Sequence, residues 1–244
     1  MNGFINLALA AAMVSPPEQA TGTFEVDRLT TSAGDLRITF IGHASLMFEF
    51  GGKVIYSDPV GQFGDFSTLP KADLILVAHE HGDHFDPETI RGVSTAKTAV
   101  VLTPLCATKH PGGIVLKNGE SATVAGFRVE AVPAYNRLHM RSPGAPYHPK
   151  GDGNGYILTF GERRVYLAGD TENIPEMKGF GRIDVAFLPM NLPYTMTPMM
   201  VADAARMLKP AILYPYHTTD TDVSKLAPLL KDEKGIEIRI RRMP

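Results

Sequence analysis

Alternating apolar and polar positions mark the first third of the chain as β-structure. Residues 36–40 and 46–50 place apolar side chains at every second position. Successive side chains of a strand point to opposite faces, so this period of two predicts half-buried strands. Gly51-Gly52 supplies a tight turn, and residues 53–57 return as the partner strand. The continuous apolar run at residues 73–78 predicts a strand that is covered on both faces.

A second hairpin follows the same pattern later in the chain. Residues 156–160 and 164–168 are apolar strands on either side of a turn at Gly161-Glu162. An aspartate comes after each hairpin, Asp58 after the first and Asp170 after the second. This echo predicts two related halves within one domain, each of which delivers an aspartate at the end of a strand.

The remaining third of the chain alternates strands with helices. Strands are predicted at residues 183–188, 211–216 and 236–240. One helix is predicted from Thr197-Pro198 to Leu208, because proline suits the first helical position, and a second at residues 221–231. The class is therefore α/β, with the polar chemistry placed just beyond the strand ends, where open sheets place their sites.

Length and composition agree with one globular domain, which we expect to cover residues 23–244. A chain of 244 residues with 44% hydrophobic content can bury a substantial core. The 24 basic and 26 acidic residues give a net charge of -2, so nothing in the charge indicates a nucleic-acid or membrane partner. Cys106 is the single cysteine, which excludes an intramolecular disulfide and a cysteine-rich zinc site, and we interpret it as a small buried residue.

Residues 1–22 are apolar enough to raise the question of targeting. The run from Phe4 to Val14 is too short to span a membrane and precedes Pro16-Pro17. It is either a signal peptide or an N-terminal helix packed on the domain. A signal peptide begins with a positively charged region, but no lysine or arginine precedes Arg28, which argues against the first alternative. The first alternative implies a periplasmic or secreted protein and the second a cytoplasmic one. No other stretch is long enough to span a membrane.

The strongest chemical signal is the segment His79-Glu80-His81-Gly82-Asp83-His84, directly after a hydrophobic strand. Imidazole and carboxylate groups are the ligands that suit zinc, iron and manganese. His79 and His81 lie two residues apart on an extended loop and can face one ion, while Asp83 and His84 lie one turn further on. The spacing therefore favours two adjacent ions. A zincin motif is excluded, because its second histidine would have to stand where Asp83 does.

The pattern His79-x-His81-x-Asp83-His84 resembles the signature of the metallo-β-lactamase superfamily, and the resemblance covers residues 36–220. It implies a four-layered αββα sandwich made of two pseudo-symmetric halves. It also implies two divalent ions, zinc with manganese or iron as alternatives. By this resemblance His79 and His81 bind the first ion and Asp83 and His84 the second, while Asp170 bridges the two and His217 completes the second site.

The third ligand of the first ion departs from the family pattern. The family places a histidine after a Pro-Ala-like step at a strand end, but Pro133-Ala134-Tyr135 is followed here by Asn136. His148 is close enough in sequence to supply the imidazole, and we favour it over Asn136 because imidazole is the better ligand for zinc or iron. His139 is a third alternative.

Four further residues are candidates for supporting the site or the substrate. His43 lies in Gly42-His43-Ala44-Ser45, which with residues 194–198 is similar to the superfamily branch that includes ascorbate-6-phosphate lactonases. Asp58 is a candidate partner of a ligand histidine, and Tyr194 a candidate pocket wall. Arg137 belongs to a basic loop, residues 136–150, that indicates an anionic substrate.

The function predicted from this site is hydrolysis. A divalent ion lowers the pKa of water from about 15.7 to about 7, so that a hydroxide bridging two ions can attack an ester, lactone, phosphodiester or amide bond. Asp83 and Asp170 are the predicted catalytic residues, and the predicted partner is a small molecule. The alternatives are a nucleic-acid-processing phosphodiesterase, an iron-dependent redox protein and a metal-binding protein without catalysis. Nothing in the sequence indicates an oligomeric state.

Overall fold

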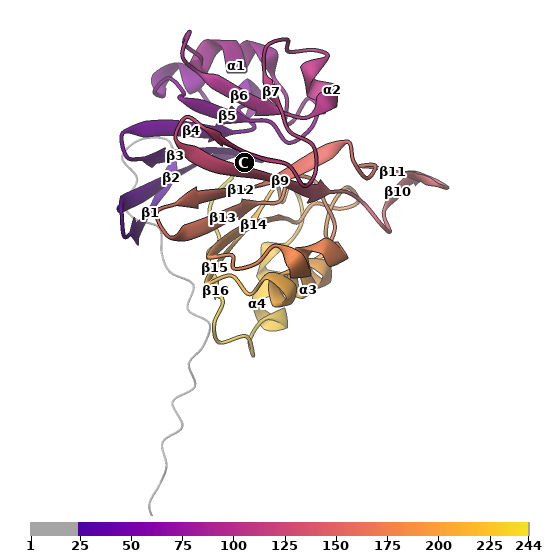
Figure 1. Cartoon of the computed structure of the whole chain (residues 1–244). Helices are drawn as coiled ribbons and strands as arrows, with labels where there is room; N and C mark the ends of the chain where they lie inside the picture. The colour runs from indigo at the N-terminus through magenta and orange to yellow at the C-terminus, as the bar shows by residue number, and fades with distance from the viewer. Residues whose placement is uncertain (1–23, 244) are drawn as a thin grey trace, which may run out of the picture.

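Two seven-stranded mixed sheets dominate the computed structural model, which describes residues 24–243 (Figure 1). In spatial order, the first sheet consists of β1 (Glu25–Thr31), β2 (Gly34–Gly42), β3 (Ser45–Phe50), β4 (Lys53–Ser57), β5 (Leu74–Leu76), β6 (Ala99–Leu102) and β7 (Ile114–Val115). The second consists of β16 (Glu237–Ile238), β15 (Ile212–Tyr216), β14 (Val185–Pro189), β13 (Arg163–Leu167), β12 (Gly153–Phe160), β9 (Phe127–Ala134) and β8 (Ser121–Val124). The predicted strands of the first sheet are confirmed, and β5 is covered on both faces. The prediction that residues 36–40 and 46–50 are half-buried is wrong, because most of β2 and β3 is buried on both faces.

The sheets pack face to face, and helices cover their outer faces. Aromatic rings from both sheets meet between them: the ring centroid of Phe40 in the first sheet lies 6.2 Å from that of Phe187 and 5.1 Å from that of Tyr214 in the second. The helices are α1 (Pro87–Val93) and α2 (Pro104–Ala107) outside the first sheet, and α3 (Pro198–Leu208) and α4 (Leu226–Leu229) outside the second. The predicted four-layered αββα sandwich is confirmed.

The two halves repeat one strand order, as the echoing hairpins predicted. β3 and β4 form an antiparallel hairpin whose second strand pairs in parallel with β5. β12 and β13 do the same, and β13 pairs in parallel with β14. Asp58 follows β4 and Asp170 follows β13, so both aspartates leave their sheets at the same end of a parallel strand.

Helix boundaries follow the sequence prediction at α3 but not near the C-terminus. The side chain of Thr197 accepts a hydrogen bond from Met200 N at the start of α3. The helix predicted at residues 221–231 is wrong: a 3₁₀ turn, η4 (Val223–Lys225), and the short α4 take its place. Pro228 explains the break, because a proline has no N–H to donate and its ring collides with the preceding helical turn. β16 is also shorter than the strand predicted at residues 236–240.

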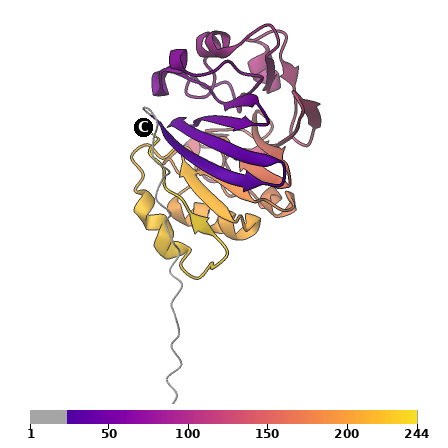
Figure 2. The same cartoon turned by 90° about the vertical axis from the view of Figure 1, so that its left-hand side faces the viewer.

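β1, the first strand of the described chain, lies beside the last described residues (Figure 2). Contacts between them join the two sheets at this edge. Asp27 of β1 is buried and accepts hydrogen bonds from Nε and Nη2 of Arg241, each at 2.9 Å, and from the hydroxyl of Tyr214. A buried carboxylate that is fully paired in this way ties the two sheets together at one edge.

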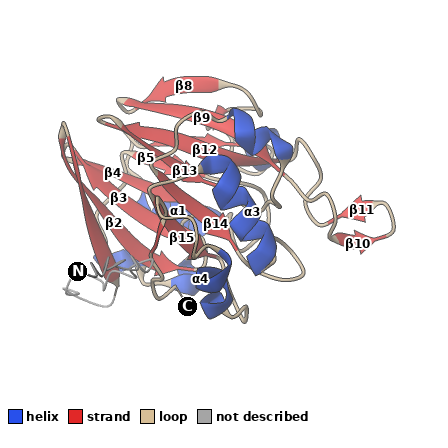
Figure 3. Ribbon diagram, turned by 90° about the horizontal axis from the view of Figure 1, so that it is seen from below, coloured by secondary structure: helices blue, strands red, loops and turns tan. Residues whose placement is uncertain are grey.

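One element belongs to neither sheet. β10 (Met140–Ser142) and β11 (Ala145–Pro146) form a two-stranded hairpin that projects from the body of the protein (Figure 3). Among the described residues, none of the helices has the length and apolar character needed to cross a membrane. The predicted N-terminal signal peptide or helix, residues 1–22, lies outside the described residues.

Three further short 3₁₀ turns complete the described elements: η1 (Gly61–Phe63), η2 (Phe66–Thr68) and η3 (Pro175–Gly179). The first two connect β4 to β5, and η3 follows the loop that carries Asp170.

Candidate metal centre

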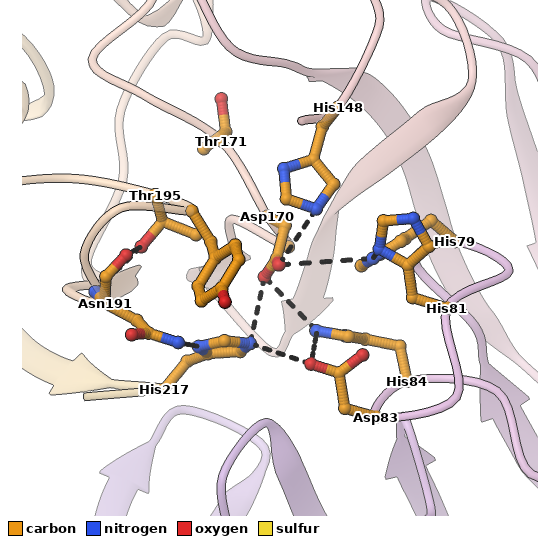
Figure 4. Close-up of polar contacts among 12 residues, drawn as sticks. His79, His81, Asp83, His84, His148, Asp170, Thr171, Asn191, Thr195 and His217 are labelled. Carbon is orange, nitrogen blue, oxygen red and sulfur yellow. Dashed lines mark hydrogen bonds and ion pairs between the residues drawn. The ribbon is translucent and has the colours of Figure 1, made fainter. Parts of the chain in front are cut away.

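The polar residues predicted from strand ends meet at one edge of the sandwich (Figure 4). The segment that begins at His79 leaves β5, Asp170 leaves β13, and His217 leaves β15. His148 comes from outside both sheets, directly after the β10–β11 hairpin. The carboxyl ends of parallel strands share an edge of the sheet, which explains why residues far apart in sequence converge here.

Three imidazoles form the first group of the site. Ligand-type atoms of His79, His81 and His148 all lie within 4.8 Å of one another. His79 Nε2 is 3.0 Å from His81 Nδ1, and the rings of His79 and His148 are 5.0 Å apart between centroids. This is the donor set that zinc and iron accept from proteins.

A second group lies next to it and contains one carboxylate. His43, Asp83, His84 and His217 also place ligand-type atoms within 4.8 Å of one another. Asp83 Oδ2 is 3.5 Å from His217 Nε2 and 3.9 Å from His84 Nε2. Asp83 and His84, the two members contributed by the predicted segment, lie close to His217, and His84 also lies beside His79 of the first group, with 4.1 Å between ring centroids.

Asp170 lies between the two groups and presents one oxygen to each. Its Oδ2 is 3.2 Å from His148 Nε2 and 4.0 Å from His79 Nε2. Its Oδ1 is 3.2 Å from His84 Nε2 and 3.3 Å from His217 Nε2. The carboxylate is buried, so these imidazoles, rather than water, form its surroundings.

Outer contacts fix the orientation of two of the imidazoles. His84 Nδ1 lies 2.9 Å from Asp58 Oδ2, and the other oxygen of Asp58 accepts a hydrogen bond from Ala78 N. His148 Nδ1 lies 2.7 Å from Asn136 Oδ1. A proton on each Nδ1, directed at these oxygens, leaves Nε2 of His84 and His148 free to bind a metal.

Buried atoms without partners test whether a cation fits this centre. In the described part of the chain, His84 Nε2, His217 Nε2 and Asp170 Oδ1 are buried and make no hydrogen bond. Leaving such atoms unsatisfied costs free energy, and native structures rarely do so without a reason. A cation placed between them would give all three a partner, so the residues present fit a metal ion.

The charge distribution agrees with this fit. Burial lowers the pKa of His79 well below its usual value, which keeps the imidazole neutral, the form that binds metals. Burial opposes ionisation of Asp170, but the imidazoles of His217 and His84 outweigh it, so its pKa lies well below the usual range. Burial also opposes a charge on His84, but Asp170 and Asp58 raise its pKa well above the usual value. The surroundings that stabilise a proton there also stabilise a metal cation.

The alternatives for the third residue of the first group are separated by their contacts. Asn136 does not join the group: its Oδ1 contacts His148, and its Nδ2 donates to Tyr194 O at 2.9 Å. His139 is directed away, with Nδ1 2.8 Å from Glu172 Oε1. Only His148 among the three brings an imidazole nitrogen to His79 and His81.

The other predicted residues take different positions. His43 contacts Asp83 Oδ2 through Nε2 at 3.1 Å and stacks on Phe63, so it lies at the rim of the second group. Tyr194 is 45% exposed and lines the cavity in front of the centre. Arg137 is exposed and does not line that cavity, so the prediction that it faces the substrate has no support in the geometry.

That cavity opens directly onto the metal-ligand candidates. It has a volume of about 600 Å³. Its lining combines the centre with residues of the hairpin and of the loop after β14: His81, Gly82, Asp83, Arg141, Tyr147, His148, Asp170, Asn191, Tyr194 and His217. A cavity of this size holds a small molecule.

Sequence reasoning missed two residues that support the site. Glu172 is fully buried and accepts hydrogen bonds from the backbone N–H groups of residues 137, 138 and 139 at 2.7–2.8 Å. Burial opposes its ionisation, but these N–H groups outweigh it and lower its pKa. Asn191 places Nδ2 3.3 Å from His217 Nδ1. It directly follows β14, so the rule that sites lie just beyond strand ends, called the strand-end rule below, could have predicted it.

We expect Glu172→Gln to lower the free energy of unfolding by about 1–3 kcal/mol, because an amide cannot accept from all these donors and leaves buried N–H groups unpaired. Urea denaturation of chelator-treated protein measures this separately from metal binding. Glu176→Gln is the matched control: its carboxylate is 29% exposed and binds Lys150, so the expected loss is at most about 1 kcal/mol. Equal losses in the two variants would contradict the role assigned to Glu172.

Comparison with known proteins agrees with the fold. A family model described as the beta-lactamase superfamily domain matches residues 37–217. The solved structure of a candidate metal-dependent hydrolase from Parabacteroides distasonis is 49% identical and superposes with a TM-score of 0.86, covering 91% of this chain and 100% of that one. The chain is thus a metal-dependent hydrolase of the metallo-β-lactamase fold.

Two curated relatives narrow this class to a family. A UPF0173 metal-dependent hydrolase from Pyrococcus abyssi is 34% identical over 198 residues, and one from Pelotomaculum thermopropionicum is 31% identical over 192 residues. Each alignment covers 75% of this chain and 84% of the relative. The chain belongs to the UPF0173 metal-dependent hydrolase family.

Proposed function

We propose that this protein hydrolyses an ester, lactone, phosphodiester or amide bond of a small molecule at a centre of two divalent ions. One observation carries the proposal of two ions: the carboxylate of Asp170 presents Oδ2 to the first histidine group and Oδ1 to the second. A carboxylate between two sets of nitrogen donors is suited to bridging two cations.

The ligands proposed for each ion follow from the two groups. His79, His81 and His148 bind the first ion, and Asp83, His84 and His217 bind the second, with Asp170 shared between them. We propose zinc, with manganese or iron as alternatives, because imidazole and carboxylate suit all three. Asp58 and Asn136 orient His84 and His148 through their Nδ1 atoms.

The bound ions would supply an activated water at neutral pH and positive charge for the oxygen that becomes negative during hydrolysis. Asp83 would orient the attacking water by accepting a hydrogen bond from it. Its side chain is 39% exposed, so the carboxylate is accessible for this role. His43 holds Asp83 in place through its Nε2 contact at 3.1 Å. Burial opposes ionisation of Asp83, but its contacts with the imidazoles of His217 and His43 outweigh burial and lower its pKa, so the acceptor stays charged.

The choice of substrates to test rests on sequence resemblance rather than on the geometry of the site. The similarity of residues 42–45 and 194–198 to the ascorbate-6-phosphate lactonase branch makes a phosphorylated lactone a member of the substrate panel. Lactones, phosphodiesters and β-lactams complete the panel, because hydrolysis of each produces an oxyanion that two cations stabilise.

Metal analysis of protein purified without chelator tests the proposal together with the substrate panel. We expect two equivalents of metal in the natural protein and metal-dependent hydrolysis of at least one substrate. His79→Ala is expected to remove about one equivalent and to lower kcat/KM by about a thousandfold, which corresponds to about 4 kcal/mol. Less than one equivalent in the natural protein, or unchanged activity in His79→Ala, would overturn the proposal.

A further inference from the structure

The loop between β9 and β12 is rich in basic side chains, and their contacts show which of them is available to a substrate. His139 contacts Glu172, Lys150 binds Glu176 at 2.6 Å, and His148 faces Asp170. Each of these is engaged by a carboxylate. The loop therefore offers fewer free cations than its sequence indicates.

Arg141 is the cation that remains at the cavity. It lies on β10, lines the same 600 Å³ cavity as His81, Asp83 and His217, and is exposed. Among residues 24–243 no carboxylate pairs with Arg141. Its guanidinium instead lies over an aromatic ring, with Cζ 5.9 Å from the centroid of Tyr147. A guanidinium over an aromatic ring still has N–H donors to offer to a ligand.

Two tyrosines form a wall beside this guanidinium. The rings of Tyr147 and Tyr194 meet edge to face with centroids 5.0 Å apart, and both line the cavity. Tyr194 comes from the loop after β14, so the wall joins the hairpin side of the cavity to the side of the second sheet. Aromatic walls of this kind pack against the apolar part of a small molecule.

The base of the hairpin is fixed, which gives Arg141 a defined position. Glu172 accepts from three consecutive backbone N–H groups that end at His139, two residues before Arg141. On the other side, Asn136 N donates to His148 O at 2.9 Å, and His148 N donates to Asn136 Oδ1 at 2.9 Å. An isolated two-stranded hairpin is marginally stable alone, so these contacts determine where it lies.

The net charge of the cavity with metal ions bound favours an anionic ligand. Asp83 and Asp170 are the carboxylates in its lining, and divalent ions at the centre would more than neutralise them. Arg141 adds a further positive charge at a separate place in the cavity. Such a cavity attracts anions and orients those with a second negative group.

We propose that Arg141, with Tyr147 and Tyr194, forms a subsite that binds an oxyanion of the substrate other than the group being hydrolysed. The subsite takes a carboxylate or a phosphate carried on a short apolar body, which packs against the two rings. A guanidinium binds either oxyanion through two parallel hydrogen bonds. This proposal rests on the proposed hydrolysis at the metal centre.

Hydrolysis of three 4-nitrophenyl esters by the metal-loaded protein tests the subsite. 4-Nitrophenyl butyrate is neutral, mono(4-nitrophenyl) glutarate adds a carboxylate, and 4-nitrophenyl 4-phosphonobutyrate adds a phosphonate. We expect Arg141→Gln to raise KM for the charged esters by about tenfold, the effect of losing one charge-assisted contact, and to change kcat little. The neutral ester should be unaffected, and the larger loss among the charged esters identifies carboxylate or phosphate.

Two further variants separate this effect from a general disturbance of the loop. Arg137→Gln removes an equal charge from the same loop outside the cavity, and we expect it to leave the preference for charged esters intact. Arg141→Lys retains the charge but not the paired hydrogen bonds, and should recover part of the lost affinity. An equal loss on the neutral ester in Arg141→Gln, or a larger effect of Arg137→Gln, would overturn the proposal.

Equilibrium binding keeps the test independent of turnover. Isothermal titration of the metal-loaded protein with glutarate and 4-phosphonobutyrate should show Arg141→Gln weakening both about tenfold and Arg137→Gln leaving both unchanged. Metal content is measured in each variant so that loading is equal. If neither these esters nor any member of the substrate panel is hydrolysed but glutarate affinity still depends on Arg141, the hydrolysis proposal fails and the subsite stands. Unchanged glutarate and phosphonobutyrate affinities would refute the subsite alone.

Discussion

Asp170→Ala is expected to have the largest effect of any single substitution, because Asp170 serves both halves of the proposed centre. Its two oxygens face different histidine groups, so its removal leaves each ion one ligand short and places four imidazoles around an empty position. We expect the metal content to fall below one equivalent. Hydrolysis should fall by at least about a thousandfold, or about 4 kcal/mol at the transition state.

Inductively coupled plasma mass spectrometry and steady-state kinetics measure both effects on one preparation. Asp203→Ala is the control, because Asp203 lies on the exposed side of α3 and contacts Asn173. A thermal melt of the chelator-treated variant shows whether it still folds. Two equivalents of metal retained in folded Asp170→Ala would contradict the bridging role, and an effect of equal size in Asp203→Ala would show that the loss is not specific.

The second large effect should distinguish His148 from Asn136. His148→Ala removes an imidazole that lies beside His79 and His81, and we expect it to cost about one equivalent of metal and most of the activity. Asn136→Ala removes the acceptor for His148 Nδ1 and other hydrogen bonds of the loop but no proposed ligand, so both ions should still bind. The affinity of the first ion should fall by about 10–100-fold, the usual cost of losing a partner of a ligand histidine.

Competition with a fluorescent zinc chelator gives the affinity for each ion in both variants. His139→Ala serves as the comparison, since its imidazole contacts Glu172 instead of the centre. Loss of a full equivalent in Asn136→Ala, with retention in His148→Ala, would reverse the assignment. Equal stoichiometry in all three variants would mean that none of them holds the first ion.

The strand pattern carried most of the information about the fold. The period of two at residues 36–40 and 46–50, and the echo between the hairpins that precede Asp58 and Asp170, depend on local side-chain alternation, which sequence records directly. The helix predicted at residues 221–231 failed for a local reason as well, because Pro228 interrupts it. Apolar periodicity outweighed the proline in that prediction.

For the site, the strand-end rule predicted which side chains would meet, and the structure brings His79, Asp170 and His217 together. It could not separate Asn136 from His148. The two lie twelve residues apart, and their contact exists only because the intervening hairpin folds back on itself. Glu172 left no signal because three of its partners are backbone N–H groups, which every residue except proline possesses, and its side-chain partners lie more than 30 residues away in sequence.

The same limit explains the basic loop. Sequence shows five cationic or imidazole side chains between residues 136 and 150 but not which carboxylates they meet. Lys150 is engaged by Glu176, a residue 26 positions away, and His139 by Glu172, 33 positions away. Charge content could therefore indicate an anion, but only tertiary contacts single out Arg141.

The position of β10 and β11 outside both sheets has a consequence for how this family can diversify. β10 and β11 pair with each other and with no strand of the two seven-stranded sheets. We therefore expect substitutions, insertions or deletions at residues 140–147 to leave the strand register and the packing of the two sheets unchanged. Glu172 and Asn136 fasten its two ends and leave its tip unconstrained. We therefore expect changes in the hairpin to alter substrate selectivity while the residues of the metal centre stay the same.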